Sequence, residues 1–211
     1  VQTCALPILF AYTHVGEFWH EDFLDTASVY ITDMSQMFYE TPFNQDISNW
    51  EVSSVTDMAR MFGGTTSFNQ DVGSWNVSMV TNMRGMFQGA TSFNQDISGW
   101  NVSSVTDMRA MFGNASSFDQ DLGGWDVSNV TAFDDDVTGT GFLQNAQLSP
   151  TNYDALLIGW EQLNLQDGLS FDAGSSRYTS AAEAARQAII NDDGWTINDL
   201  GLVAPNTASQ T

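Results

Sequence analysis

Apolar residues recur along the middle of the chain with a period of 25 residues. Each repeat opens with Phe and continues with Ile, Val or Leu, then Trp, then Val. The second half of the repeat places Val, Met, Met and Phe at positions i, i+3, i+6 and i+7. The tryptophans keep this period without error, at Trp50, Trp75, Trp100 and Trp125. A sequence period of this size is typical of proteins built from stacked repeats.

The two halves of the repeat predict different local structure. In the central copy, residues 93–102 hold the aromatic and β-branched types that favour extended chain, with Ser and Gly between them for turns. Val105, Met108, Met111 and Phe112 then share one face of a short helix. Parallel strands would line one side of the stack and helices another. We therefore predict an α/β solenoid, in which the methionines belong to the core and not to a metal or haem site.

After Val130 the repeat pattern stops and a different α/β pattern begins. Ser149-Pro150 is a helix start, since Pro suits the first turn. Ser180 and Glu183 have capping-box spacing, which predicts a second helix through Ile190. Two strand candidates, Leu169–Phe171 and Trp195–Ile197, lie 26 residues apart. This region is predicted to cap the repeats.

The patterns divide the chain into five parts. Residues 26–133 are tandem repeats, 134–203 a C-terminal capping module and 204–211 a linker, while 9–25 are an N-terminal cap or partial coil. Residues 1–8, Val-Gln-Thr-Cys-Ala-Leu-Pro-Ile, resemble a translated sequencing adapter and are left out of the fold. We accordingly expect the native start, with any export signal, to be lost.

The charge of the chain is strongly one-sided. There are 26 acidic residues, five arginines and no lysine, for a net charge of −21. Such a surface repels phosphate backbones and anionic headgroups, which argues against nucleic-acid or membrane-surface partners. Either solubility in a salty or extracellular setting or a face that binds divalent cations would explain the charge. The single cysteine, Cys4, permits no intrachain disulfide, and no apolar run is long enough to span a membrane.

The repeat consensus, Phe-Asn-Gln-Asp-Ile-Ser-x-Trp-x-Val-Ser-Ser-Val-Thr-x-Met-x-x-Met-Phe, resembles the surface-protein repeat of BspA-like and listerial-type lipoproteins. Those repeats are grouped with leucine-rich repeats. Asn152–Trp160, Ala184–Gln187 and Gly194–Ile197 are similar to the segment that closes such arrays in secreted Bacteroidetes proteins. The resemblance implies a leucine-rich-repeat-like solenoid on a bacterial surface or secreted from the cell, often called an adhesin, with no catalytic residue. The chain departs from the consensus at Pro42 and at 132–136, which we interpret as the ends of the array.

Two variable columns flank the tryptophans and are expected to face solvent. They are Asn49, Ser74, Gly99 and Gly124, followed by Glu51, Asn76, Asn101 and Asp126. We expect these positions to bind an extracellular protein or glycan partner of a monomeric, non-catalytic, adhesin-like module. A passive spacer, or the accessory module of a secreted enzyme lost from this chain, are the alternatives.

One aspartate recurs in each repeat, at Asp46, Asp71, Asp96 and Asp121. Like charges stacked in register are unfavourable unless each is neutralised or hydrogen-bonded. The first interpretation is that each carboxylate accepts N–H bonds in a turn. The alternative is calcium bound by oxygens of adjacent coils. We predict no other cofactor and no catalytic residue, because no Ser-His-Asp arrangement is visible.

Overall fold

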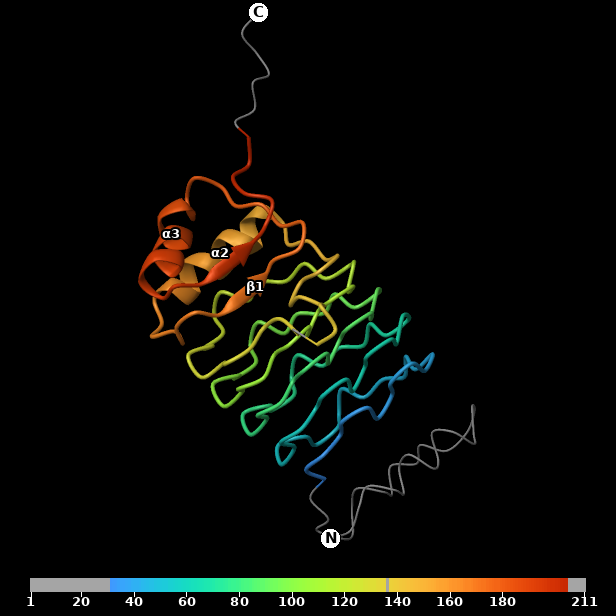
Figure 1. Cartoon of the computed structure of the whole chain (residues 1–211). Helices are drawn as coiled ribbons and strands as arrows, with labels where there is room; N and C mark the ends of the chain where they lie inside the picture. Colours follow the sequence, from blue (N-terminus) through green and yellow to red (C-terminus); the bar gives the residue numbers. More distant parts are fainter. Residues whose placement is uncertain (1–30, 136, 205–211) are drawn as a thin grey trace, which may run out of the picture.

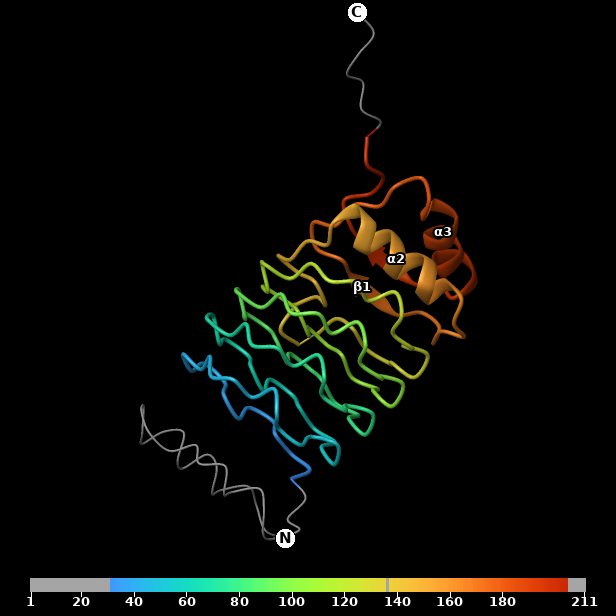
Figure 2. The ribbon, with the colours of Figure 1, turned by 180° about the vertical axis from the view of Figure 1, so that it is seen from behind.

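The polypeptide winds into successive coils that stack along one axis, with a helical module at one end (Figure 1). The structure, a computed structural model, describes residues 31–135 and 137–204. The view from behind shows the same stack, which runs from the blue to the yellow part of the ribbon (Figure 2). Among the described residues, the regular elements are α2 (Pro150–Glu161), β1 (Ser170–Asp172), α3 (Glu183–Asp192) and β2 (Thr196–Asn198), which follow the repeats.

Several predictions concern residues outside this described part. They are the adapter-like segment 1–8 with Cys4, the N-terminal cap 9–25, the first five residues of the array and the linker beyond Ala204. Among the helices that the structure describes, none is long and apolar enough to cross a membrane.

Backbone hydrogen bonds join neighbouring coils in a parallel register. The N–H of Thr81 donates to the carbonyl of Thr56 at 2.9 Å, and its hydroxyl donates to the same oxygen at 3.2 Å. The same two bonds join Thr56 to Thr32, Thr106 to Thr81 and Thr131 to Thr106. The next column forms parallel bridges through Asp33, Asp57, Asn82, Asp107 and Ala132. These contacts therefore join equivalent positions of successive repeats, so neighbouring coils are aligned with each other.

The helix predicted in the second half of each repeat is not found, because residues 31–135 contain no α-helix. The N–H groups of Met58, Arg60 and Phe62 donate to carbonyls of the next coil, at 2.8–2.9 Å. The N–H of Met61 closes a turn on the carbonyl of Met58, at 3.1 Å. Alternate N–H groups are therefore unavailable for the i to i−4 bonds of a helix. One such turn follows another after two or three residues. The turns therefore bury apolar residues such as Val55, Met58 and Met61 three residues apart, a spacing that also fits one face of a helix.

The parallel strands predicted in the first half of each repeat are not found either. In the array, the parallel bridges run through the Asp57 column, in the half that was predicted to be helical. The first half consists of turns, such as the bond from the N–H of Trp75 to the carbonyl of Val72 at 3.1 Å. Ser and Gly between the apolar residues favour turns over a continuous strand. The extended pairing is taken instead by the Thr-Asp-Met segment.

The core columns of the repeat are buried as predicted. The six methionines of the three complete coils, Met58, Met61, Met83, Met86, Met108 and Met111, are 0% exposed. The rings of Phe87 and Phe93 stack within one coil with centroids 3.9 Å apart, and Phe87 stacks on Phe112 of the next coil at 5.8 Å. The interior is therefore a set of identical side chains stacked from coil to coil.

The C-terminal module follows its sequence pattern more closely. The hydroxyl of Ser149 accepts the N–H of Asn152 at the start of α2, as predicted. The strand predictions are confirmed to within one residue, and Phe171 of β1 pairs with Ile197 of parallel β2. The capping box is wrong: α3 begins at Glu183 with Ala182 as N-cap and without a side-chain bond.

The module also continues the columns of the array. The indole Nε1 of Trp125 donates to the carbonyl of Ile97 in the preceding coil, at 3.1 Å. The indole of Trp160 on α2 makes the equivalent bond to the carbonyl of Leu122, at 3.0 Å. The helix α2 therefore takes the place of one further coil against the last repeat.

Candidate functional site

All eight predicted binding positions are exposed. Six of them flank buried indoles, since Trp75, Trp100 and Trp125 are 1–4% exposed, and the other two flank the partly buried Trp50. We name the stretch between the Phe and Val columns of each coil the polar strip; it comprises residues 44–51, 69–76, 94–101 and 119–126. Exposed side chains of the strip differ from coil to coil in the two columns beside the tryptophans.

One of the two predicted columns has a structural task that the sequence did not reveal. Oε1 of Glu51 accepts the N–H of Ser53 at 2.9 Å. Oδ1 of Asn101 accepts both the N–H of Ser103, at 3.2 Å, and its hydroxyl, at 2.7 Å. Asn76 and Asp126 accept the same N–H of the turn, at 3.2 and 3.1 Å. Each residue of this column thus supplies one side-chain oxygen that accepts the N–H of its turn. The four residues differ only in the remaining side-chain atoms.

The other predicted column carries no such requirement. A Cβ atom built on Gly99 or Gly124 meets nothing within 4 Å. The hydroxyl of Ser74 makes one long bond, to the carbonyl of Ser48 at 3.5 Å. A side chain can therefore be added at Gly99 and Gly124 without a clash at its Cβ atom, which makes this column the more permissive of the two.

The recurring aspartates lie in turns, as the first interpretation proposed. Oδ1 of Asp71 accepts the N–H of Gly73 at 2.9 Å, and Asp121 accepts that of Gly123 at 2.8 Å. The N–H and hydroxyl of Ser48 lower the pKa of Asp46 in the same geometry, and the hydroxyl and N–H of Ser98 lower the pKa of Asp96. In the described ranges, no three His, Cys, Asp or Glu side chains are grouped to hold a metal ion. Calcium binding stays a prediction.

A second set of polar contacts links the coils through asparagines, and we name it the amide ladder. Oδ1 of Asn69 accepts the N–H of Asn94 and the Nε2 of Gln95, both at 2.9 Å. Asn44 and Asn94 repeat this with the next coils, so the ladder comprises Asn44, Asn69, Asn94, Gln70, Gln95 and Gln120. The recurrence of Phe-Asn-Gln-Asp in successive repeats was its only signal in the sequence.

The ladder ends where an aspartate replaces the asparagine. Oδ1 of Asp119 accepts the N–H of Ser149 at 2.7 Å and the Nδ2 of Asn152 at 2.8 Å. Both donors belong to the start of α2 and not to a further repeat. At the junction the carboxylate therefore takes over the role of accepting two donors that Asn69 and Asn94 have within the ladder.

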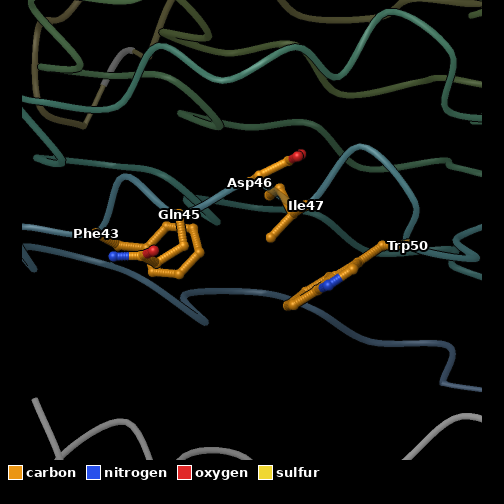
Figure 3. A pocket seen from close by; sticks show the side chains of 5 residues that line it. All are labelled: Phe43, Gln45, Asp46, Ile47 and Trp50. Carbon is orange, nitrogen blue, oxygen red and sulfur yellow. The ribbon is translucent and has the colours of Figure 1, made fainter. Parts of the chain in front are cut away.

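A shallow hollow of about 200 Å³ lies on the first coil, at the N-terminal end of the polar strip. Figure 3 shows the five side chains that line it: Phe43, Gln45, Asp46, Ile47 and Trp50. The ring of Phe43 stacks on the ring of Phe38, with centroids 3.7 Å apart. The hollow thus combines two aromatic rings with one amide and one carboxylate.

The polar strip has a uniform electrostatic character. Its four segments contain seven Asp and Glu residues and no Lys, Arg or His. The arginines of the array lie elsewhere: Arg60 is over the ring of Tyr39, Arg84 pairs with Asp135 at 2.5 Å and Arg109 pairs with Asp107 at 2.6 Å. An anionic partner would therefore be repelled along the whole strip.

The pair of Arg84 and Asp135 fixes the end of the array. Asp135 is 2% exposed and lies 51 residues beyond its partner in sequence. Burial raises the pKa of Asp135, but the bonds from Arg84 and from the N–H groups of Val137 and Thr138 outweigh burial and lower the pKa to about 2. The carboxylate is therefore charged at every physiological pH.

A comparison with known protein families assigns the repeat region to one of them. The family described as "Mycoplasma protein of unknown function, DUF285" matches residues 32–149, which is 118 of the 211 residues. The chain belongs to this family. DUF285 is a repeat-type family, and the matched region holds the whole amide ladder and stops just before α2. Neither the curated proteins nor the solved structures contain a significant match to the chain.

Proposed function

We propose that this DUF285 chain is a non-catalytic binding module, secreted or displayed on a bacterial surface, that recognises a protein or glycan partner through its polar strip. The proposal includes a leucine-rich-repeat-like solenoid of the BspA-like type. The observation that carries it is the split within the strip. The backbone of each coil is tied to its neighbours by the same bonds, whereas the side chains at Asn49, Ser74, Gly99 and Gly124 contribute one long hydrogen bond, from the hydroxyl of Ser74 to the carbonyl of Ser48 at 3.5 Å.

A bonded backbone that carries a column of variable, exposed side chains supports binding more than catalysis. The exposed carboxylates of the strip are held by serines of their own turns: the serine side chain and then its N–H lower the pKa of Glu51 and Asp96, and the N–H and then the side chain of Ser48 lower the pKa of Asp46. A general acid needs a raised pKa, so these groups are poor proton donors near neutral pH. Their fixed positions suit the recognition of hydroxyl, amide or cationic groups of a partner.

The test is a binding screen on glycan and protein arrays, with a blocking variant. Gly99→Tyr with Gly124→Tyr adds bulky side chains to the open column, where a Cβ atom at either position meets nothing within 4 Å. We expect roughly tenfold weaker binding to any partner, because a bulky group in the centre of an interface excludes close contact. Ser180→Tyr with Ala184→Tyr, at exposed positions of the C-terminal module, is the matched control and should leave binding unchanged.

The alternative is a passive spacer, which the one-dimensional stacking of the coils also favours. A spacer needs the frame but not the exposed columns. Absence of any partner on both arrays, with the thermal unfolding of the blocking variant unchanged, would support the spacer and refute the binding module.

A further inference from the structure

We propose that the partner of the polar strip is a neutral linear polysaccharide that lies along the stack axis, about one sugar ring to each coil. This inference rests on the proposed function and names the ligand class of the same surface. It depends on the groups that the amide ladder leaves unbonded at each coil.

The ladder engages the Oδ1 atom of each asparagine and the Nε2 atom of each glutamine. Oδ1 of Asn69 is taken by the N–H of Asn94 and by the Nε2 of Gln95. Within the described residues, no hydrogen bond is made by Nδ2 of Asn69 or by Oε1 of Gln95. Each of the three steps of the ladder, at Asn44, Asn69 and Asn94, therefore offers solvent an amide donor with two hydrogens and an amide acceptor, at positions fixed by the ladder itself.

A carboxylate accompanies this pair in every coil. Oδ1 of Asp71 is held by the N–H of Gly73, as Oδ1 of Asp96 is held by Ser98. Within the described ranges Oδ2 of both aspartates makes no hydrogen bond, and both side chains are exposed. The combination of an amide donor, an amide acceptor and a carboxylate matches sugar hydroxyl groups, each of which donates one hydrogen bond and accepts others.

The direction of the ligand follows from the repetition. Identical groups recur only from coil to coil, at Asn44, Asn69 and Asn94, and coils paired in parallel register are spaced by about 4.8 Å. A polymer of identical units along the axis meets the same set of groups again at each step. A folded protein partner presents no such repetition, so the ladder favours a chain of sugars over a protein surface.

The charge of the strip decides which polysaccharides fit. Seven carboxylates and no cationic side chain would repel uronate, sulfate and phosphate groups. Each coil contributes little affinity by itself, because its groups are solvated when free. Affinity should therefore grow with the number of sugar units that contact successive coils.

The experiment measures binding of a soluble β-glucan, a β-mannan and a xylan by isothermal titration calorimetry, with alginate as the anionic comparison. The decisive variant is Asn44→Asp with Asn69→Asp and Asn94→Asp. An aspartate keeps the ladder, as Asp119 does for Ser149 and Asn152, but it removes the free amide donors. The charge-matched control is Asn164→Asp with Asn191→Asp and Asn198→Asp, at exposed positions of the C-terminal module.

We expect at least one neutral polysaccharide to bind, alginate not to bind, and affinity to rise from disaccharide to hexasaccharide. The ladder variant should bind roughly tenfold more weakly, and the control should stay within about twofold of the unmodified chain. Equal affinity of the ladder variant, or no dependence on chain length, would overturn the inference. If no polysaccharide binds while a protein partner is found and is blocked by Gly99→Tyr with Gly124→Tyr, the proposed function stands and this inference fails. If neither class binds, both fail.

Discussion

The repeat array and the C-terminal module solve the same packing problem in opposite ways. In the array, equivalent rings stack nearly parallel, as Phe93 and Phe118 do with a 4° angle between their planes. In the module, Phe142 and Trp160 meet edge to face at 66°, and Trp160 and Phe171 do so at 64°. Identity of side chains lets coils stack without limit, because each coil presents the same surface that it covers.

A stack of identical coils has no built-in end, so the module must be different. Trp160 supplies the indole of the next coil from a helix, and the start of α2 supplies the donors that Asp119 accepts. Buried polar bonds between α2, α3 and β2 then replace the repeated ladders. Arg186 and the hydroxyl of Tyr153 both donate to Asp199, at 2.8 and 2.7 Å. The array is therefore held by many similar contacts that recur in each coil, whereas the module is held by a few contacts that occur once.

The largest expected effect tests this contrast with one substitution in each region. Asp199→Asn leaves Arg186 without its buried partner and should destabilise the chain by about 3–5 kcal/mol. Asp107→Asn breaks an ion pair in which Arg109 is 33% exposed and should cost less than about 1 kcal/mol. Urea unfolding of both variants measures the difference. Equal losses would mean that the module is held like the array.

The junction can be tested with two glycines. A Cβ on Gly159 of α2 would lie 2.0 Å from the carbonyl oxygen of Gly123 in the last coil, so the helix and the coil must separate to admit it. Gly159→Ala should therefore cost about 1–3 kcal/mol through overpacking. Gly99→Ala, at an open position of the array, should change stability by less than about 0.5 kcal/mol. A harmless Gly159→Ala would show that α2 does not press on the coil.

The Arg84–Asp135 pair, at the boundary, predicts a dependence on pH. The folded pKa of Asp135 is lowered to about 2, below an unfolded value near 3.9. Its contribution, about 2 kcal/mol, is complete above the unfolded pKa and is lost as pH falls toward about 2. Urea unfolding at several pH values should show the unmodified chain losing its advantage over Asp135→Asn in acid. A difference that is constant from neutral pH to pH 2 would contradict this assignment.

The last prediction concerns the bonds of the amide ladder within the array. Asn69→Ala removes the acceptor of the Asn94 N–H and of Gln95 at an exposed site, and should cost about 1 kcal/mol. Asn94→Ala should cost a similar amount, because the two positions are equivalent in the ladder. Thermal or urea unfolding measures both. Markedly unequal losses would show that the coils are not energetically alike.

Sequence reasoning located the candidate site better than it described it. The eight predicted positions follow from their variation between repeats, and all are exposed. The turn bonds made by Glu51 and Asn101 were not foreseen, because Asn and Glu at a variable position carry no sign of an acceptor role. The amide ladder was missed for a related reason. Its bonds join residues 25 apart, and only the register between coils brings them together.

The sequence by itself determined the period, the buried columns, the start of α2 and the two strands of the module. These depend on residue type and spacing within a short window, such as Ser149-Pro150 or the methionine columns. Only the tertiary structure decided between helix and turns in the repeats. The spacing of Val55, Met58 and Met61 fits both, and the choice rests on where Met58 and Arg60 send their N–H bonds. Those acceptors lie in the next coil, so no local pattern could have revealed them.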